Sequence, residues 1–320
     1  MVSVSAIVPT HNRSRYLRDA IISLQKQDFP DDEYEIIVVD NNSTDDTLEV
    51  VKECNGNDKK KVIYVKDSEI GLHNARHTGA KTAKGEILAY VDDDGICDVK
   101  WLYEIVKPYD NPEVGCVGGK ILPKWEAVPP GWIRQYPSYL SLLDLGDEVK
   151  ELKMPRIYGC NLSIRRSLLF EVGGFNPDAF GDKRQIWFRG DGESGLLRKV
   201  LASGRKIIYT PHAIIYHVIP EKRLTLDYFK RRSFIEGISA SFVANRAEKF
   251  SRIKLFYRSC KFYFAAIICR TLAIIYKIVK NNKFLKYEFA SSSYKSRSIY
   301  EFKLIYDKKL KLHVERKNWL

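Results

Sequence analysis

Short apolar runs alternate with amphipathic segments along the first ninety residues of the chain. The apolar runs are Val4–Val8, Tyr34–Val39, Val62–Val65 and Ile87–Val91. The segments between them carry apolar residues at helical spacing and are Tyr16–Gln27, Thr44–Cys54 and Leu72–Lys84. This alternation is typical of a parallel sheet covered by helices. The sequence therefore predicts an α/β fold whose first half is Rossmann-like.

The pattern becomes less regular after about residue 122. Pro123–Pro137 is rich in proline and tryptophan and is expected to be a loop rather than one regular element. Strands are then expected at Arg156–Arg165, Lys206–Tyr209 and Ala213–His217, and helices at Ser167–Val172 and Glu193–Ala202. We predict an α/β domain over residues 1–220, with two halves that meet near residue 122, and a helical region over residues 221–320.

Charge divides the chain at the same place. Residues 1–220 contain 29 Lys and Arg against 32 Asp and Glu, whereas residues 221–320 contain 24 against 8. A nucleic-acid-binding protein usually spreads its basic surface over the folded domain that reads the bases, so nucleic acid is not an expected partner. A basic region confined to one end instead favours an anionic membrane surface as its partner.

Phe262–Val279 is about long enough to cross a bilayer, but Arg270 lies near its middle. A central arginine costs roughly 2.5–3.5 kcal/mol on insertion, and basic residues flank the segment on both sides. We therefore favour an interfacial or re-entrant helix. A true span and a soluble helical cap remain the alternatives.

The remaining bulk features agree with an intracellular enzyme. The six cysteines are scattered, without the spacing of a zinc site or a disulfide framework, and are expected to be reduced thiols. Val4–Val8 begins without a basic or long apolar leader, so a cleaved secretory signal is not expected. We predict a cytoplasmic protein that is peripheral on the cytoplasmic face of the membrane.

Polar residues follow three of the predicted strands. They are Thr10-His11-Asn12, Asp40-Asn41-Asn42 and Asp92-Asp93-Asp94. Ligands of open α/β sheets collect at the carboxyl ends of strands, so these clusters should meet in one crevice. Asp92 and Asp94 can both reach one hard cation such as Mg²⁺ or Mn²⁺. The alternative is a solvated acidic turn, although three adjacent carboxylates repel one another unless something compensates them.

Four ordered segments resemble the motifs of glycosyltransferase family 2. They are V-S-A-I-V-P-T-H-N-R at Val4–Arg13, I-I-V-V-D-N-N-S-T-D at Ile36–Asp45, Gly71–Gly79 with Arg76, and G-E-I-L-A-Y-V-D-D-D at Gly85–Asp94. The resemblance extends to about residue 220. It implies a GT-A fold, which is a mixed sheet flanked by helices, and an inverting transfer from a nucleotide-diphosphate sugar with a divalent metal ion, Mn²⁺ or Mg²⁺.

The resemblance also implies roles for individual residues. Those expected to bind the nucleotide-sugar are Pro9, Thr10, His11, Arg13, Asp40, Arg76, Asp92 and Asp93. Asp94 would be the principal metal ligand, with Asp92 and His217 completing the set. For His11, Asp40 and His217 a purely structural role is the alternative, because aspartate also caps turns and helices.

The catalytic base is left open between two carboxylates. The family usually carries a Gly-Glu-Asp-type pair at the start of a helix, whereas this chain reads R-G-D-G-E-S-G-L at Arg189–Leu196. Glu193 is favoured and Asp191 is the alternative. Whichever is not the base would interact with the positive end of the helix.

Two further segments are expected on the acceptor side. Arg156–Arg166 and Gly173-Gly174-Phe175 resemble the acceptor segment of the family, in which the small Gly159 permits close approach of a substrate. A strand with a tight turn is the alternative. Trp125 and Trp132 are either platforms for sugar rings or packing anchors.

The predicted function is transfer of a sugar to a hydroxyl of a glycan or lipid-linked acceptor, in surface polysaccharide or glycoconjugate biosynthesis. A nucleotidyltransferase or a dehydrogenase would need a glycine-rich loop after the first strand, and Pro9–Arg13 contains no glycine. The alternative is an inactive nucleotide-sugar-binding homologue or a membrane scaffold subunit.

Overall fold

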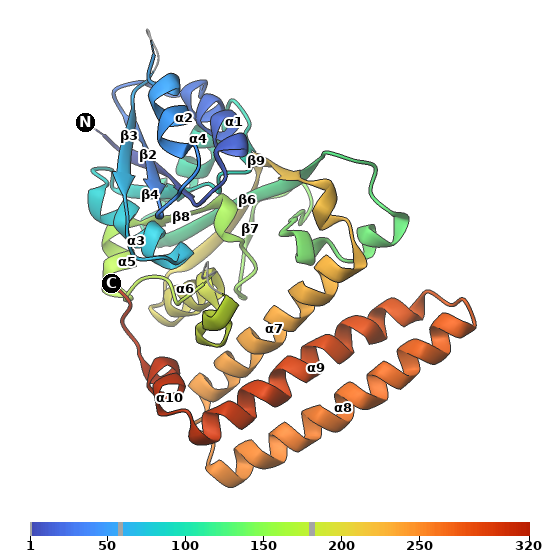
Figure 1. Ribbon diagram of the computed structural model, residues 1–320. Coiled ribbons are helices and arrows are strands. Elements are labelled where there is room, and N and C mark those ends of the chain that lie inside the picture. Colours follow the sequence, from blue (N-terminus) through green and yellow to red (C-terminus); the bar gives the residue numbers. More distant parts are fainter. Residues whose placement is uncertain (1, 57–59, 179–182) are drawn as a thin grey trace.

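The computed structural model describes residues 2–56, 60–178 and 183–320. One mixed sheet forms the centre of the α/β part, with strand order β3-β2-β1-β4-β8-β6-β9-β5 and the short β7 paired to β9 (Figure 1). The strands are β1 Val4–Thr10, β2 Tyr34–Asp40, β3 Val62–Lys66, β4 Ile87–Tyr90, β5 Gly95–Cys97, β6 Val114–Trp125, β7 Lys150–Glu151, β8 Leu162–Arg165 and β9 Lys206–Ile219. The helices are α1 Ser14–Gln25, α2 Thr47–Cys54, α3 Leu72–Thr82, α4 Trp101–Val106, α5 Arg166–Glu171, α6 Gly192–Ala202, α7 Leu226–Ala247, α8 Arg252–Ile278, α9 Lys283–Tyr306 and α10 Lys308–Glu315.

The first half is Rossmann-like, as the sequence predicts. β1, β2, β3 and β4 are parallel neighbours, and β1 and β2 are buried along their whole length. Such continuous burial requires cover on both faces of the sheet. Two apolar cores supply it, one under α1, α2 and α4 and the other under α3, α5 and α6. The fold class is confirmed.

The second half departs from its expected boundaries in three places. Within the expected strand Arg156–Arg165, only Leu162–Arg165 is strand, and Gly159–Asn161 forms a 3₁₀ turn. β6 runs from Val114 to Trp125, so the start of the expected loop at Pro123–Pro137 is strand. β9 joins the two expected strands at Lys206–Tyr209 and Ala213–His217 into one, with an irregularity in its pairing to β6 near Gly119. Such a bulge bends β9 while both of its parts stay paired with β6. The pattern of residues along the sequence does not reveal this continuity.

The C-terminal region forms a layer of long helices beside the α/β part. α9 lies between α7 and α8, and α8 packs on α9 (Figure 1). α8 is the one helix, within the described residues, long and apolar enough to cross a membrane by length and composition, and 17% of its apolar window is buried. Arg270 of α8 pairs with Glu288 of α9, and Arg258 pairs with the fully buried Glu301 at 2.7 Å. The central arginine therefore has a partner within the helical layer.

The helical layer is joined to the α/β part at both of its ends. The rings of Trp132 and Phe229 lie 4.8 Å apart, in an aromatic cluster that also contains Phe289 of α9. Trp132 is thus a packing anchor. At the other end of the helical layer, the residues that follow α10 contact the α/β part, and the amide of Trp319 donates to the carbonyl of Gly173 at 3.2 Å. α7 is therefore held against the acceptor side of the sheet.

Candidate active site

A cavity of about 280 Å³ opens at the carboxyl ends of β1 and β4. Its lining residues are Pro9, Thr10, His11, Arg13, Asn41, Ile70, Leu72, Ala75, Asp92 and Asp93. Six of them are among the residues expected to bind the nucleotide-sugar. Ile70, Leu72 and Ala75 give the cavity an apolar surface that suits a flat aromatic ring, and ligand cavities are usually lined in this way.

His11 and Asp40 both have structural partners. The Nδ1 atom of His11 lies 2.7 Å from the carbonyl oxygen of Asn41, so this nitrogen carries the hydrogen. One carboxylate oxygen of Asp40 accepts from the amide of Ser43 at 2.7 Å, and the other accepts from the hydroxyl of Tyr64 at 2.6 Å. The turn role of Asp40 is thus present, and the side chain lies outside the set that lines the cavity. A contact of Asp40 with the nucleotide stays a prediction.

The three aspartates at the end of β4 point in different directions. Asp92 is 32% exposed and accepts from Arg76 Nη2 at 3.2 Å. Asp93 is buried and accepts from the hydroxyl of Thr10 at 2.8 Å. Burial raises the pKa of Asp93 to about 7, although Arg13 opposes this shift. Of the three, Asp92 alone lines both the cavity at the ends of β1 and β4 and a second one that Asp94 also lines.

Asp94 is the centre of a charged cluster. Its Oδ2 atom lies 2.5 Å from Arg13 Nη2, 3.1 Å from Arg223 Nη2 and 3.3 Å from His217 Nε2. Burial alone would raise the pKa of Asp94, but His217, Arg13 and Arg223 hold it well below its usual range. The carboxylate therefore stays ionised inside the protein.

His217 is oriented by the backbone. Its Nδ1 atom lies 3.0 Å from the carbonyl oxygen of Leu140, and because a carbonyl only accepts, Nδ1 carries a hydrogen. Nε2 is left to face Asp94 and the Nη1 atom of Arg223, which lies 3.0 Å away. A neutral imidazole in this orientation can offer Nε2 to a metal ion. Within the described residues, however, no three acidic, His or Cys side chains are grouped as ready ligands.

A second cavity, of about 230 Å³, joins this cluster to the acceptor side. Arg76 is fully buried beside it and contacts Asp92 at 3.2 Å and Glu193 at 3.7 Å. Burial opposes its charge, yet these two carboxylates raise the pKa of Arg76 above its ordinary value. A Cβ atom on Gly159 would clash with the Arg76 guanidinium. The small Gly159 thus makes room for Arg76, and Arg76 links the two halves of the site.

The two candidate bases have different surroundings. Asp191 forms an ion pair with Arg198 and accepts from the side-chain amide of Asn176 at 2.6 Å. Glu193 lines the cavity that Asp92 and Asp94 also line, whereas Asp191 does not. Burial, and next to it the charge of Asp178, raise the pKa of Glu193 above its usual value. Of the two candidate bases, Glu193 is therefore the one that shares a cavity with Asp92 and Asp94.

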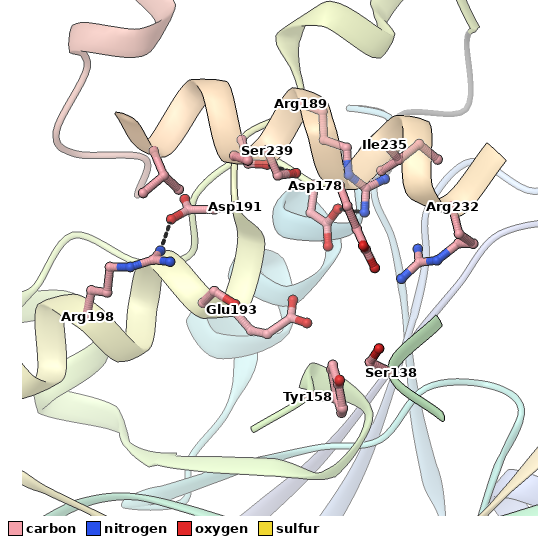
Figure 2. A pocket seen from close by; sticks show the side chains of 15 residues that line it. Ser138, Tyr158, Asp178, Arg189, Asp191, Glu193, Arg198, Arg232, Ile235 and Ser239 are labelled. Carbon is pink, nitrogen blue, oxygen red and sulfur yellow. Dashed lines mark hydrogen bonds and ion pairs between the residues drawn. The ribbon is translucent and has the colours of Figure 1, made fainter. Parts of the chain in front are cut away.

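A third cavity, of about 450 Å³, lies between α6 and α7 (Figure 2). Tyr158, Asp178, Arg189, Glu193 and Arg232 line this cavity and the second one, so the two are continuous. Burial raises the pKa of the Tyr158 hydroxyl to about 12, so it remains a hydrogen-bond donor. One wall of this acceptor-side cavity comes from the helical C-terminal region.

Two buried histidines of α3 fix the loop that supports this cavity. His77 Nε2 accepts from the amide of Phe175 at 2.8 Å, and His73 Nδ1 accepts from the amide of Asp178 at 3.3 Å. Burial lowers the pKa of His77 to about 3 and that of His73 to about 4. Both rings are therefore neutral acceptors in the native protein.

All predicted site residues except Asp40 line one of these three cavities, which share lining residues, and residues from elsewhere in the chain line them too. Arg223 and Arg232 belong to the basic region that we assigned to membrane contact. A sequence signal for Arg223 exists, because it follows His217 by six residues and the chain turns at Pro220 directly after β9. No comparable signal marks Arg232, whose position depends on how α7 packs.

The chain resembles known proteins in sequence and in structure. It is 28% identical over 244 residues to the glucosyl-dolichyl phosphate glucuronosyltransferase of Haloferax volcanii, with 74% of this chain and 76% of that protein aligned. It is 26% identical over 289 residues to the GalNAc(5)-diNAcBac-PP-undecaprenol beta-1,3-glucosyltransferase of Campylobacter jejuni, with 89% and 86% aligned. The mannosyltransferase PcManGT of Pyrobaculum calidifontis, solved with GDP-Man and Mn²⁺, superposes with a TM-score of 0.63 at 20% identity over 95% of this chain and 87% of that one.

The structural likeness supports the fold, and the sequence supports the family. The arrangement of the sheet and its flanking helices matches GT-A glycosyltransferases. The sequence profile described as Glycosyl transferase family 2 matches residues 5–173, which is more than half of the chain. The motifs at the ends of β1, β2 and β4 lie within that range. The chain belongs to glycosyltransferase family 2.

Proposed function

We propose that this glycosyltransferase moves a sugar, with inversion, from a nucleoside-diphosphate donor to a hydroxyl of a lipid-linked or glycan acceptor. The supporting observation is the position of Arg76, which contacts Asp92 on the donor side and Glu193 on the acceptor side. An anomeric carbon between these carboxylates would have its leaving group on one side and the attacking hydroxyl on the other. That is the arrangement that a displacement with inversion requires.

The donor occupies the cavity at the end of β1 in this proposal. The nucleoside lies against Pro9, Thr10 and His11, with Asp40 near the edge of the base. The diphosphate then lies toward Arg13 and Arg76, whose guanidinium groups neutralise phosphate oxygens. Asp92 and Asp93 complete the donor side.

Two of the proposed ligands lie together, and they suit a divalent cation, Mn²⁺ or Mg²⁺. Asp94 Oδ2 and His217 Nε2 lie 3.3 Å apart, and a carboxylate together with the neutral form of an imidazole would suit such an ion. Asp94, Asp92 and His217 are the proposed ligands. When bound, the ion would neutralise charge on the leaving diphosphate.

Glu193 is the proposed base. Its carboxylate takes the proton of the acceptor hydroxyl as the oxygen forms a bond to the anomeric carbon. The bond from that carbon to the diphosphate breaks, and the nucleoside diphosphate leaves with the electron pair. A raised pKa brings a carboxylate closer to the range in which a general base works at neutral pH. Asp191 holds Arg198 and the start of α6 instead.

The outer face of α8 is the proposed membrane contact. It exposes large apolar side chains, and the helices around it carry the basic excess of residues 221–320. The exposed apolar residues of α8 are Ile253, Phe256, Tyr257, Tyr263, Phe264, Ile267, Ile268, Ile274, Ile275 and Ile278. Apolar contact combined with cationic charge favours an anionic bilayer surface. A span is disfavoured, because α8 is tied to the charged α9 by the pairs of Arg258 and Arg270.

A panel of nucleotide-sugars tests the proposed function. A donor that binds the native protein should raise its melting temperature in the presence of Mn²⁺. With an acceptor present, the sugar of that donor should be transferred. Without an acceptor, the donor should be slowly hydrolysed. Chelation of the metal should abolish both the rise in melting temperature and the turnover of the donor. Binding without turnover with any lipid-linked or glycan acceptor would instead support an inactive nucleotide-sugar-binding homologue. Absence of any donor binding would leave the scaffold alternative.

A further inference from the structure

Three arginines line the acceptor-side cavity, and two of them form ion pairs with carboxylates that also line it. Arg232 of α7, Arg189 of the segment before α6, and Arg198 of α6 line it (Figure 2). Arg189 is paired with Asp178, and Arg198 with Asp191. The Arg232 guanidinium makes neither a hydrogen bond nor an ion pair with any residue in the described ranges, and its Nε atom is buried from solvent.

The carboxylates around Arg232 do not replace the missing partner. Glu193 lies 3.7 Å from Arg76. Glu236 lies one helical turn beyond Arg232 on α7, and its exposed side chain forms no ion pair with Arg232 in the described part of the chain. Asp178, which lines the same cavity, is paired with Arg189. The half-buried Arg232 thus has no hydrogen-bonded or ion-paired carboxylate among the described residues, and it points into the cavity (Figure 2).

Such a cation is unfavourable in the empty protein unless a ligand supplies the missing anion. Arginine presents a planar fork of donors that matches a phosphate group in a bidentate manner. The hydroxyls of Ser138 and Tyr158 line the same cavity and can donate to further phosphate oxygens. The cavity is thus suited to an acceptor that is itself phosphorylated.

We propose that Arg232 binds a phosphate group of the acceptor and thereby restricts the acceptor to a short glycan carried on a lipid phosphate or diphosphate. This inference rests on the proposed function. Arg232 and Glu193 line the same two cavities, so the phosphate would be held in the cavity that also holds the hydroxyl that Glu193 deprotonates. A long glycan, glycosylated far from its lipid, would not place a phosphate there.

Farnesyl diphosphate is a soluble probe of this site. Its affinity for the full chain would be measured by calorimetry, beside those of farnesol and of UDP and GDP with Mn²⁺. In Arg232→Gln we expect binding of farnesyl diphosphate to weaken at least tenfold, while farnesol and the nucleotides bind as in the wild type. Arg231→Gln is the matched control, because Arg231 is the exposed neighbour on the same helix. That variant should bind all four ligands as the wild type does.

The experiment distinguishes an acceptor phosphate from the donor diphosphate, and failure of this inference from failure of the proposed function. Equal weakening of farnesyl diphosphate and nucleotide binding would assign Arg232 to the donor diphosphate and overturn the inference. Unchanged binding of farnesyl diphosphate would also overturn it, and intact nucleotide binding would leave the proposed function standing. If Arg232→Gln does not fold, Arg232→Lys keeps the charge but not the fork, and wild-type affinity in that variant would contradict bidentate binding.

Discussion

Arg223 Nη2 lies 3.1 Å from Asp94 Oδ2, which joins the connection between β9 and α7 to the last aspartate of the strand-end triplet. Arg223 is 18% exposed and also lies 3.0 Å from His217 Nε2. A guanidinium group therefore stands between the two side chains proposed to hold the metal ion. A metal ion held by Asp94 and His217 would take the place of the Arg223 guanidinium as a positive partner of Asp94.

Replacement of Arg223 by Gln distinguishes the effect of the guanidinium on Asp94 from the effect of a bound metal ion. The variant should be less stable than the wild type by about 1–3 kcal/mol without metal, because a buried carboxylate loses a charged donor. Mn²⁺ should then raise its melting temperature more than it raises that of the wild type, since no guanidinium has to move. Thermal unfolding with Mn²⁺ and with a chelator measures both effects.

Arg15→Gln is the control for this measurement. Arg15 forms an exposed pair with Glu126 at 3.1 Å and lies outside the cavities described above. Its loss should change neither the stability nor the response to Mn²⁺ appreciably. A smaller metal response in Arg223→Gln than in the wild type would contradict the proposed exchange of partners.

Replacement of Glu193 by Gln tests the base. The amide cannot take a proton, so turnover should fall by about 10²–10⁴-fold while donor affinity is retained. Asp191→Asn should reduce turnover much less and should mainly lower the melting temperature, because Asp191 pairs with Arg198 and accepts from Asn176. Steady-state rates and nucleotide affinities of the two variants give the comparison. The opposite ranking of their rates would assign the base to Asp191.

The donor half of the site was predictable because its geometry is a property of the sheet. Parallel strands end at one edge, so residues that follow β1, β2 and β4 must meet there, and Thr10 does contact Asp93 at 2.8 Å. The spacing of residues along three strands thus translates directly into proximity. The motif resemblance added chemical roles to positions that the strand register had already brought together.

The acceptor half was less predictable because its residues come from loops and from a packed helix. The position of Arg232 depends on α7 packing against the aromatic cluster around Trp132, and no periodicity in the sequence specifies that contact. The basic excess of residues 221–320 concealed it, since one functional arginine looks like its neighbours. Similarly, Arg270 interrupts an apolar run in sequence, but in space it pairs with Glu288.

Acid should destabilise the protein partly through His77. Its pKa is about 3 in the folded chain against about 6.5 when unfolded, so below pH 6.5 the unfolded state binds a proton that the native state excludes. This contribution is complete above pH 6.5 and is lost as the pH falls. Between pH 6.5 and pH 5 it amounts to about 2 kcal/mol. Thermal unfolding at a series of pH values measures it.

His77→Gln should flatten this dependence. A glutamine oxygen can still accept from the amide of Phe175, but it does not titrate. The fall in melting temperature between pH 7 and pH 5 should therefore be smaller in the variant than in the wild type. His212→Gln, at an exposed histidine, should leave the slope unchanged. An identical slope in His77→Gln and the wild type would show that His77 contributes nothing to the acid sensitivity.

Membrane binding should depend on the exposed apolar face of α8. Phe264 and Ile268 are 62% and 59% exposed and lie one helical turn apart, so Phe264→Glu with Ile268→Glu adds charge to that face without disturbing the contact with α9. Sedimentation with vesicles of phosphatidylserine and phosphatidylcholine should show at least tenfold weaker binding than the wild type. Val128→Glu is the control, because Val128 is 94% exposed but belongs to the α/β part.

Salt and lipid charge separate the two contributions to this binding. Wild-type binding should weaken with added salt and with removal of phosphatidylserine, since basic side chains around α8 attract the anionic headgroups. The double variant should lose the part that persists at high salt, because that part comes from apolar burial. If the double variant bound anionic vesicles as tightly as the wild type at every salt concentration, α8 would not be the contact surface, and the basic residues of α9 and α10 would be the next to examine.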